Sequence, residues 1–199
     1  MCEPMKFDHK KFFGSYREEY GSLIQSQVSG IENLLNCIER DLDVNDVRWA
    51  AYIMATVKHE CADQWQPIEE FGKGQGRPYG IEVQVTGSDG KQYLNVYYGR
   101  GYVQLMWKDN YEKMSKVLGL DDELLIHPER VMEPEIAYSI MSYGMRNGSF
   151  TGRKLSDFIR DETCDYKNAR RIINGLDRWQ TIQDYAEKLE SFFMLSRVS

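Results

Sequence analysis

The sequence predicts an α+β fold that is mainly helical and carries one β-hairpin, and three patterns support this prediction. Apolar residues recur every three or four positions over several long stretches, which is the period of amphipathic helices. Residues 81–98 instead alternate apolar and polar side chains around a Gly-Ser-Asp-Gly turn, as hairpins do. A segment rich in glycine and proline, residues 63–80, separates the first helices from the hairpin. We expect two lobes around a cleft, folded as a single domain over residues 1–199.

The chain before this glycine-rich segment is predicted to be helical. Aromatic residues spaced over 7–20 indicate a short helix, and the apolar positions of 24–38 follow a clear period of 3.6. A polar break comes next, in which Asn45 or Asp46 can cap a third helix. That helix is expected to end at Glu60, because no apolar periodicity continues beyond it.

Helical patterns return after the hairpin. We expect helices over residues 110–118 and 135–145, the second with Pro134 in its first turn. Shorter helices are expected over 153–159 and 165–173. A last helix carries on one face Ile182, Tyr185, Ala186, Leu189 and Phe193.

Composition and charge exclude several classes of function. The 199 residues are 42% hydrophobic and 28% charged, as in ordinary globular proteins, and the net charge of −6 argues against nucleic-acid binding. No apolar run is long enough to span a membrane, so membrane insertion is not expected. The four cysteines, Cys2, Cys37, Cys61 and Cys164, lack metal-ligand spacing, and we expect neither a metal nor another cofactor.

Glu60 is the first candidate catalytic residue. Ala50, Ile53, Val57 and Glu60 recur at three- and four-residue steps, which places Glu60 on the apolar face of its helix. Poor solvation should raise the pKa of this carboxyl, and the negative end of the helix dipole should raise it further. A carboxyl that keeps its proton near neutral pH suits general-acid catalysis. The alternative is a buried glutamate paired with an arginine for structural reasons.

Glu69 and Glu70 form an acidic pair in a loop that can fold back. The presence of this pair favours a catalytic role for Glu60 over a structural one. Glycoside hydrolysis uses one protonated carboxyl and one carboxylate. The sequence His59-Glu60 lacks the second histidine of an H-E-x-x-H helix, so a catalytic zinc is not expected. Cys61 comes two residues after His59, and neighbouring helix positions point to different sides, which argues against a Cys–His pair.

Aromatic residues that could line a sugar-binding cleft lie on either side of the hairpin. Sugars present apolar faces and hydroxyl edges, so aromatic and amide side chains suit such a cleft. The candidates are Tyr79, Tyr97, Tyr98, Tyr102, Trp107 and Tyr111. Aromatic residues at this density also build cores, and the sequence leaves both interpretations open.

Three blocks of sequence resemble glycoside hydrolase family 19, the family of chitinases and phage endolysins. The segment Tyr97-Tyr98-Gly99-Arg100-Gly101-Tyr102-Val103-Gln104-Leu105, followed by Asn110-Tyr111, is similar to its Y-x-G-R-G-x-x-Q-L-(S/T)-x-x-x-N-Y signature. His59-Glu60 resembles its helix-borne H-E, and Arg171-Ile172-Ile173-Asn174-Gly175 resembles its R-x-I-N-G element. The blocks stand in the family's order. The resemblance implies a lysozyme-like bilobal fold with the hairpin beside the active-site cleft.

The resemblance also implies roles for individual residues. Glu60 would be the general acid. The expected substrate-binding residues are His59, Glu69, Tyr98, Gln104, Asn110, Tyr111 and Asn174. Arg171 would support the glutamate cluster, and Arg100 would shape the turn that leads into the floor of the cleft.

The second carboxylate is assigned from its context. Compact bacterial and phage members of the family place it in P-I-x-E-(Y/F)-G, which residues 67–72 resemble, and this selects Glu70, with Glu69 tuning the charge. Met106 departs from the family, which has Ser or Thr there to help hold the attacking water; a thioether accepts hydrogen bonds only weakly. Either another group holds the water, or activity is reduced, or the chain binds glycans without cleaving them.

These features predict an inverting glycoside hydrolase that cleaves β-1,4 bonds in N-acetylated aminosugar polymers. The compact length, the short segment between Glu60 and Glu70 and the lack of a plant-type disulfide framework favour a peptidoglycan-degrading endolysin. A chitinase and a catalytically silent glycan-binding relative are the alternatives. We expect a monomer, made in the cytoplasm without a signal peptide, that acts on the cell wall after release or export.

Overall fold

The computed structural model describes residues 4–198 and divides them into two compact units. Unit 1 holds the N-terminal part up to Trp65 and the C-terminal part from Met141, and unit 2 holds Gln66–Ile140. The boundary falls inside helix α6 (Pro134–Asn147). Each unit is described by itself below, and the single domain expected over residues 1–199 stays a prediction.

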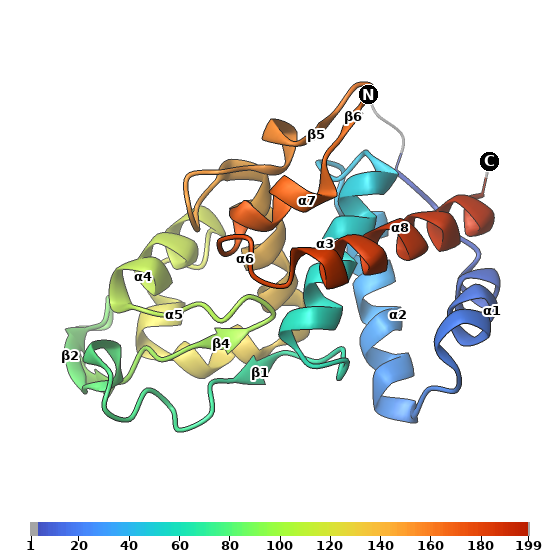
Figure 1. The fold of residues 1–199 in the computed structure, drawn as a ribbon. Helices are drawn as coiled ribbons and strands as arrows, with labels where there is room; N and C mark the ends of the chain where they lie inside the picture. The colour runs from blue at the N-terminus through green and yellow to red at the C-terminus, as the bar shows by residue number, and fades with distance from the viewer. Residues whose placement is uncertain (1–3, 199) are drawn as a thin grey trace. The chain divides into compact units, whose positions relative to one another are not determined.

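Unit 1 is built around helix α3 (Val47–Glu60). Every residue of 50–57 is fully buried, so this helix is enclosed on all sides and not on one face only, as a central helix is. Asp46 caps its first turn by accepting a hydrogen bond from the backbone N–H two residues later, at 2.9 Å. Helix α8 (Trp179–Ser196) packs against α3 and crosses it (Figure 1).

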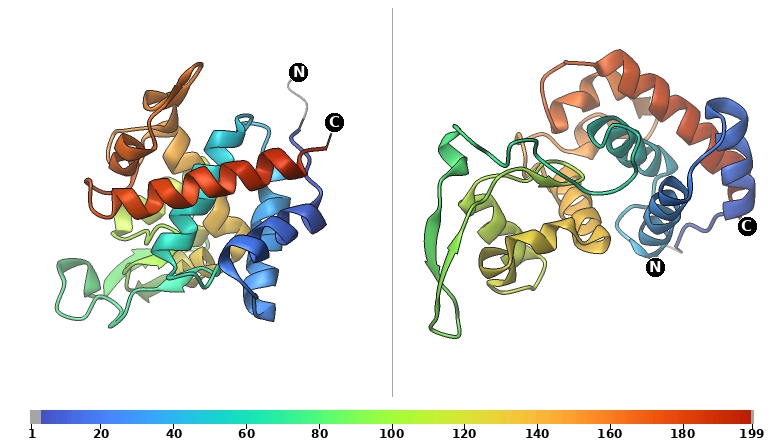
Figure 2. Two further views of the ribbon diagram at one scale, coloured as in Figure 1. Left: turned by 45° about the vertical axis from the view of Figure 1, so that its right-hand side comes forward. Right: turned by 90° about the horizontal axis from the view of Figure 1, so that it is seen from below.

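Helices α1 (His9–Tyr20) and α2 (Gln25–Arg40) lie close to the predicted ranges. The buried apolar residues of α2 are Ile31, Leu34, Leu35 and Ile38. An aromatic cluster joins α1 to α8 and consists of Phe7, Phe12, Phe192 and Phe193. Both views of Figure 2 show the segment just before α1 beside the end of α8, where the Asp8 N–H donates to the Ser196 carbonyl at 2.7 Å.

The predicted helix over residues 153–159 is wrong. Only a 3₁₀ turn, η3 (Leu155–Asp157), forms there, and it is followed by the two-residue antiparallel strands β5 (Ile159–Arg160) and β6 (Thr163–Cys164). Asp161 adopts a left-handed backbone with φ of 47°, and this conformation turns the chain back between the strands.

The predicted helix over residues 165–173 forms as two short pieces. Helix α7 (Tyr166–Ala169) begins after Asp165, whose side chain accepts a hydrogen bond from the backbone of Asn168. The chain continues into the 3₁₀ helix η4 (Arg170–Ile172). These two elements bring a pair of neighbouring arginines to the site described below.

Unit 2 contains the predicted hairpin. Strands β2 (Val83–Thr86) and β3 (Gln92–Asn95) pair antiparallel, but the return strand begins and ends earlier than the alternation predicts. A second antiparallel pair, β1 (Ile68–Glu69) with β4 (Arg100–Gly101), was not predicted, because two-residue strands are too short to show a periodicity.

Unit 2 also contains helices beside these strands. Helix α4 (Lys108–Val117) confirms the predicted helix, and α5 (Glu123–Ile126), η1 (Pro78–Gly80) and η2 (Pro128–Met132) are shorter elements. The buried residues of this unit include Tyr97, Tyr98, Tyr102, Leu105, Tyr111, Met114, Leu124 and Val131. The mainly helical α+β class is therefore confirmed. Within residues 4–198, no helix has both the length and the apolar character that a membrane span requires.

Candidate functional site

Glu60 is the last residue of α3 and forms a short ion pair. Its Oε1 lies 2.6 Å from Nη1 of Arg170, and the Glu60 side chain is 21% exposed while that of Arg170 is only 3% exposed. The Arg170 Nε donates a further hydrogen bond to the carbonyl of Asp177 at 3.0 Å, which fixes the guanidinium. The candidate acid is thus paired with a buried arginine, the contact that the sequence analysis named as the structural alternative.

The sequence motif assigned this supporting role to Arg171, and the structure corrects it by one residue. Arg171 is exposed, and its Nε donates to Oδ1 of Asn168 at 3.2 Å. Because a 3₁₀ helix has three residues per turn, neighbouring side chains of η4 point about 120° apart. Only Arg170 therefore faces Glu60.

The turn after Glu60 is closed by a cluster that we call the Asp63 clamp, made of Tyr16, Lys58, Asp63 and Trp65. Oδ1 of Asp63 accepts hydrogen bonds from the Lys58 ammonium at 2.7 Å, the Trp65 indole at 2.8 Å and the Tyr16 hydroxyl at 3.3 Å. Asp63 and Trp65 have positive φ angles, 62° and 61°, which are costly for residues other than glycine. The clamp holds this strained turn at the end of α3.

His59 and Lys58, on the last turn of α3, both have lowered pKa values. Burial lowers the pKa of His59, although the charge of Glu60 opposes the shift. Burial also lowers the pKa of Lys58, against the hydrogen bond to Asp63. Lys58 lies over the rings of Tyr16 and Tyr20, with its nitrogen 5.2 and 4.2 Å from their centres.

Glu70, in unit 2, is held by neutral donors. The Tyr79 hydroxyl donates to its Oε1 at 2.8 Å, and the backbone N–H of Gly99 donates to its Oε2 at 3.1 Å. Its own N–H donates to the Gly99 carbonyl at 2.8 Å, which continues the pairing of β1 with β4. Each carboxylate oxygen of Glu70 keeps lone-pair capacity beyond these bonds.

Glu69 is held differently from Glu70. The Tyr98 hydroxyl donates to it at 2.6 Å, the Lys73 ammonium lies 3.1 Å away, and Nε of Arg100 lies 3.6 Å away. The hydrogen bond from Tyr98 is the main cause that lowers the pKa of Glu69, and the two cations act in the same direction. These three partners favour the ionised carboxylate and make Glu69 an anchor for this loop.

The loop that carries Tyr79 closes on itself at two glycines. A Cβ on Gly80 would overlap the carbonyl group of Gly74, and a Cβ on Gly74 would lie 2.8 Å from Cα of Gly80. The φ of Gly74 is also positive, 76°. These glycines let the loop return far enough for Tyr79 to reach Glu70.

The signature segment is organised by Arg100, which the sequence assigned to structural support. Its guanidinium lies 3.5 Å from the centre of the Tyr98 ring and donates to the Tyr111 hydroxyl at 3.0 Å. Tyr111 in turn donates to the Tyr98 carbonyl at 2.7 Å and is fully buried. Tyr111 is therefore a core residue of unit 2, where its ring and hydroxyl both contact other residues, and the substrate contact implied by the motif stays a prediction.

The three amides predicted to bind substrate lie in different settings. Nε2 of Gln104 donates to the Ile68 carbonyl at 3.0 Å, and the residue has a positive φ of 52°. Asn110 is exposed on α4 and donates to the Met106 carbonyl at 2.9 Å. Asn174 is exposed in unit 1, and its Oδ1 accepts from the Gly175 N–H at 2.8 Å.

The predicted site residues therefore form two groups. Unit 1 holds His59, Glu60, Arg171 and Asn174, and unit 2 holds Glu69, Glu70, Tyr98, Arg100, Gln104, Asn110 and Tyr111. Sequence reasoning missed Arg170 and the Asp63 clamp. The arginine doublet before I-I-N-G was a visible signal for the first, but the clamp has no local signature, since its members come from separate elements.

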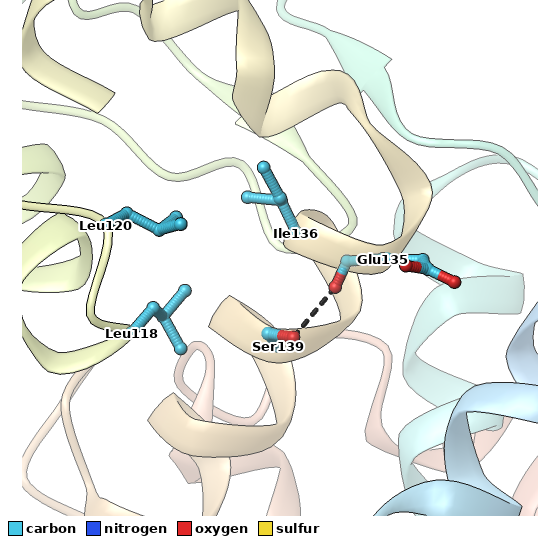
Figure 3. Close-up of a pocket in the computed structure, with 5 residues that line it drawn as sticks. All are labelled: Leu118, Leu120, Glu135, Ile136 and Ser139. Carbon is cyan, nitrogen blue, oxygen red and sulfur yellow. Dashed lines mark hydrogen bonds between the residues drawn. The ribbon is translucent and has the colours of Figure 1, made fainter. Parts of the chain in front are cut away.

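Two further pockets contain none of the predicted residues. The pocket shown in Figure 3 belongs to unit 2, where Ser139 donates to the Glu135 carbonyl at 2.8 Å. It is lined by Leu118, Leu120, Glu135, Ile136 and Ser139. The other belongs to unit 1 and is lined by Asn45, Asp46, Val47, Arg48, Glu190, Met194 and Arg197. Among the residues that the structure describes, no three His, Cys, Asp or Glu side chains are grouped to hold a metal ion.

Comparison with known sequences finds no match, either to a protein-family model or to a curated protein. Solved structures do match. Chitinase C from Streptomyces griseus HUT6037 aligns with a TM-score of 0.52 and 18% identity, over 95% of this chain and 76% of its own. A mutant of chitinase C aligns with a TM-score of 0.52 and 16% identity, over 94% and 92%.

A third structure, a bacterial family 19 chitinase described as differing from plant enzymes, aligns with a TM-score of 0.54 and 20% identity, over 95% of this chain and 94% of its own. At these identities the likeness concerns the fold, and it confirms the fold that the three sequence blocks implied. This chain has the fold of the family 19 chitinases.

Proposed function

We propose that this protein is a glycoside hydrolase that cleaves β-1,4 bonds in N-acetylated aminosugar polymers. Two observations support the proposal: the chain has the fold of family 19 chitinases, and Glu60 and Glu70 each have fixed hydrogen-bond partners within their own unit. A carboxyl pair is the chemical requirement for this reaction.

In the proposed mechanism Glu60 is the general acid and Glu70 the general base of a single displacement. Glu70 takes a proton from a water molecule whose oxygen attacks the anomeric carbon, while Glu60 gives its proton to the departing glycosidic oxygen. The bond from the anomeric carbon to that oxygen breaks, and the configuration inverts. The two carboxyl groups then return to their starting protonation states by exchange with solvent.

The partners of each carboxyl fit these roles. Arg170 stabilises the negative charge that Glu60 carries once it has donated its proton. Tyr79 and Gly99 orient Glu70 through one hydrogen bond to each oxygen, and further lone pairs remain to accept a proton from water. We assign no metal or organic cofactor to the reaction.

We propose bacterial peptidoglycan ahead of chitin as the substrate. The short segment between Glu60 and Glu70 supports a lytic enzyme of endolysin type. We propose that the enzyme is a monomer and reaches the cell wall after release or export. The names of the matching structures support chitin as the second substrate to test.

The test uses purified peptidoglycan and chitin hexamer in parallel, with new reducing ends identified by mass spectrometry. The anomeric configuration of the first product, read by NMR, should be α for inversion. Glu60→Gln keeps the size of the side chain but removes the proton donor, so hydrolysis should fall by about two to four orders of magnitude. Cleavage of neither polymer by the unaltered protein, or wild-type rates for Glu60→Gln, would refute the proposed function.

Met106 supports a second candidate, a glycan-binding protein without catalysis. The family's Ser or Thr hydroxyl is missing at this position, so the attacking water lacks one partner. Met106→Thr separates the candidates when turnover and melting temperature are measured together. We expect equal or higher turnover than in the unaltered protein. Tight glycan binding with no turnover in either form would instead establish the binding protein.

A further inference from the structure

The aromatic residues that flank the hairpin divide into buried and exposed ones. Most of them are buried in the core of unit 2: the exposed fraction is 7% or less for Tyr97, Tyr98, Tyr102 and Tyr111. Trp107 is 46% exposed, and Tyr79 is partly exposed. Of the six aromatic candidates that the sequence named, only Tyr79 and Trp107 therefore have surface to offer a ligand.

Trp107 is exposed although its backbone conformation is strained. Its φ is 73° and its ψ is 133°, in a region that bulky residues rarely adopt. Its backbone is fixed by three hydrogen bonds: its N–H donates to the Tyr97 carbonyl at 2.9 Å, and its carbonyl accepts from the N–H groups of Asn110 and Tyr111. An exposed tryptophan gains little from burial that would offset this strain, and such outliers mark functional positions.

Tyr79 connects Trp107 to the candidate base. The two rings meet edge to face, with centres 5.3 Å apart and planes at 73°. The hydroxyl at the far end of Tyr79 donates to Glu70 at 2.8 Å. The indole thus lies one aromatic ring away from the carboxylate, within the same unit.

We propose that Trp107 is a substrate-binding residue whose exposed indole stacks on a pyranose ring of the aminosugar chain. Tyr79, which contacts the indole and donates to Glu70, places the bound sugar ring beside Glu70. A pyranose ring presents a flat face of C–H groups, and tryptophan offers a broad rigid surface at the cost of only two side-chain torsions. The inference rests on the proposed function, and it names the residue that recognises the sugar there.

Tyr79 and Trp107 are expected to affect different kinetic constants. Trp107 binds a sugar that does not react, so removing the indole weakens the binding of the substrate and of the transition state equally. This raises KM and leaves kcat unchanged. Tyr79 positions Glu70, so Tyr79→Phe keeps the ring that supports Trp107 but removes the hydrogen bond on the base. It should lower kcat and leave KM close to that of the unaltered protein.

The experiment measures binding of N-acetylglucosamine hexamer by calorimetry in the Glu60→Gln background, which keeps the oligomer intact, and kinetics in the active protein. Trp107→Ala should raise Kd and KM about tenfold, the size of one aromatic contact, with kcat within about twofold. Trp107→Phe should retain most of the binding. Leu94→Ala, which removes an exposed apolar side chain of β3, is the matched control and should change neither constant.

Trp107→Gly keeps the inference testable if the alanine variant folds poorly. Glycine adopts a positive φ without strain, so this variant should melt at or above the temperature of Trp107→Ala while binding equally weakly. Unchanged Kd in Trp107→Ala and Trp107→Gly overturns the inference. Loss of binding in Phe71→Ala but not in Trp107→Ala overturns it as well, because the stacking ring would then be the exposed phenylalanine that follows Glu70 in the chain. Absence of turnover by the unaltered protein on both peptidoglycan and the hexamer refutes the proposed function itself.

Discussion

Glu60 and Glu70 have the same side chain but are supported in opposite ways. Glu60 ends a helix that is buried on all sides, and a single buried cation compensates its charge. Glu70 follows a two-residue strand, lies at the edge of a mostly exposed glycine-rich loop and is held by one hydroxyl and one backbone N–H. A cation suits a group that becomes negative as it donates a proton, whereas neutral donors orient a base without holding its charge strongly.

The two supports also differ in local stability. The residues before Glu60 are enclosed by other helices, so opening this segment requires disrupting the core of unit 1. The loop over residues 71–77 is mostly exposed, with Phe71 fully so, and its shape depends on glycines and a few side-chain hydrogen bonds. We therefore expect the proposed base to lie on the more adjustable support.

The largest expected effect tests whether Glu70 or Glu69 is the catalytic base. Glu70→Gln should lower kcat by about two to four orders of magnitude, because the amide cannot take a proton from water. Glu69→Gln should cost less than about tenfold, since Glu69 serves as an anchor for Tyr98 and Lys73. Steady-state rates on the hexamer measure both. Equal losses, or the reverse order, would show that the comparison chose the wrong glutamate.

The second effect tests the cation on Glu60. Arg170→Gln leaves Glu60 without its ion pair and should lower the free energy of unfolding by about 2–3 kcal/mol, together with activity. Arg171→Gln is the matched control and should stay within about 0.5 kcal/mol, because this arginine is exposed. Urea unfolding of both variants gives the comparison. A larger loss for Arg171→Gln would restore the assignment suggested by the sequence motif.

A third, smaller effect concerns the Asp63 clamp at the end of α3. Asp63→Asn leaves the buried Lys58 ammonium without a counter-charge and should cost about 2 kcal/mol. Lys58→Met removes that charge and keeps an apolar chain of similar length, so it should cost less than about 1 kcal/mol. Thermal unfolding ranks the two. If Lys58→Met is the more damaging change, the hydrogen bonds of Lys58 matter more than the burial of its charge.

The smallest effect is the acid dependence of the loop. The Tyr98 hydrogen bond lowers the pKa of Glu69 in the folded protein below its ordinary value of 4.5, so the unfolded chain binds more protons near this pH. Glu69 then contributes stability that is present above about pH 4.5 and is lost as the pH falls through its folded pKa. Melting temperatures between pH 3 and 6 should fall less steeply in Glu69→Gln and in Tyr98→Phe. If the melting temperatures of both variants fall with pH as steeply as that of the unaltered protein, Glu69 does not stabilise this loop.

Local patterns in the sequence predicted what depends on neighbours in the chain. Three such patterns each produced the expected element, because each depends on residues that are close together in sequence. They are the period of residues 24–38, the polar break before Asp46 and the alternation around residues 87–90. The expected helix over 153–159 failed because the left-handed turn at Asp161 made a small hairpin more favourable than another helical turn. Periodicity cannot predict such a turn at an aspartate.

By itself, the sequence determined the mainly helical class, the positions of Glu60 and the acidic pair, and the three blocks that resemble family 19. Only the tertiary structure decided that Arg170 and not Arg171 pairs with Glu60, that Tyr111 belongs to the core, and that Trp107 is exposed. The physical reason is distance along the chain. Glu60 and Arg170 are 110 positions apart, and burial is a sum over many such remote neighbours that a local pattern does not contain.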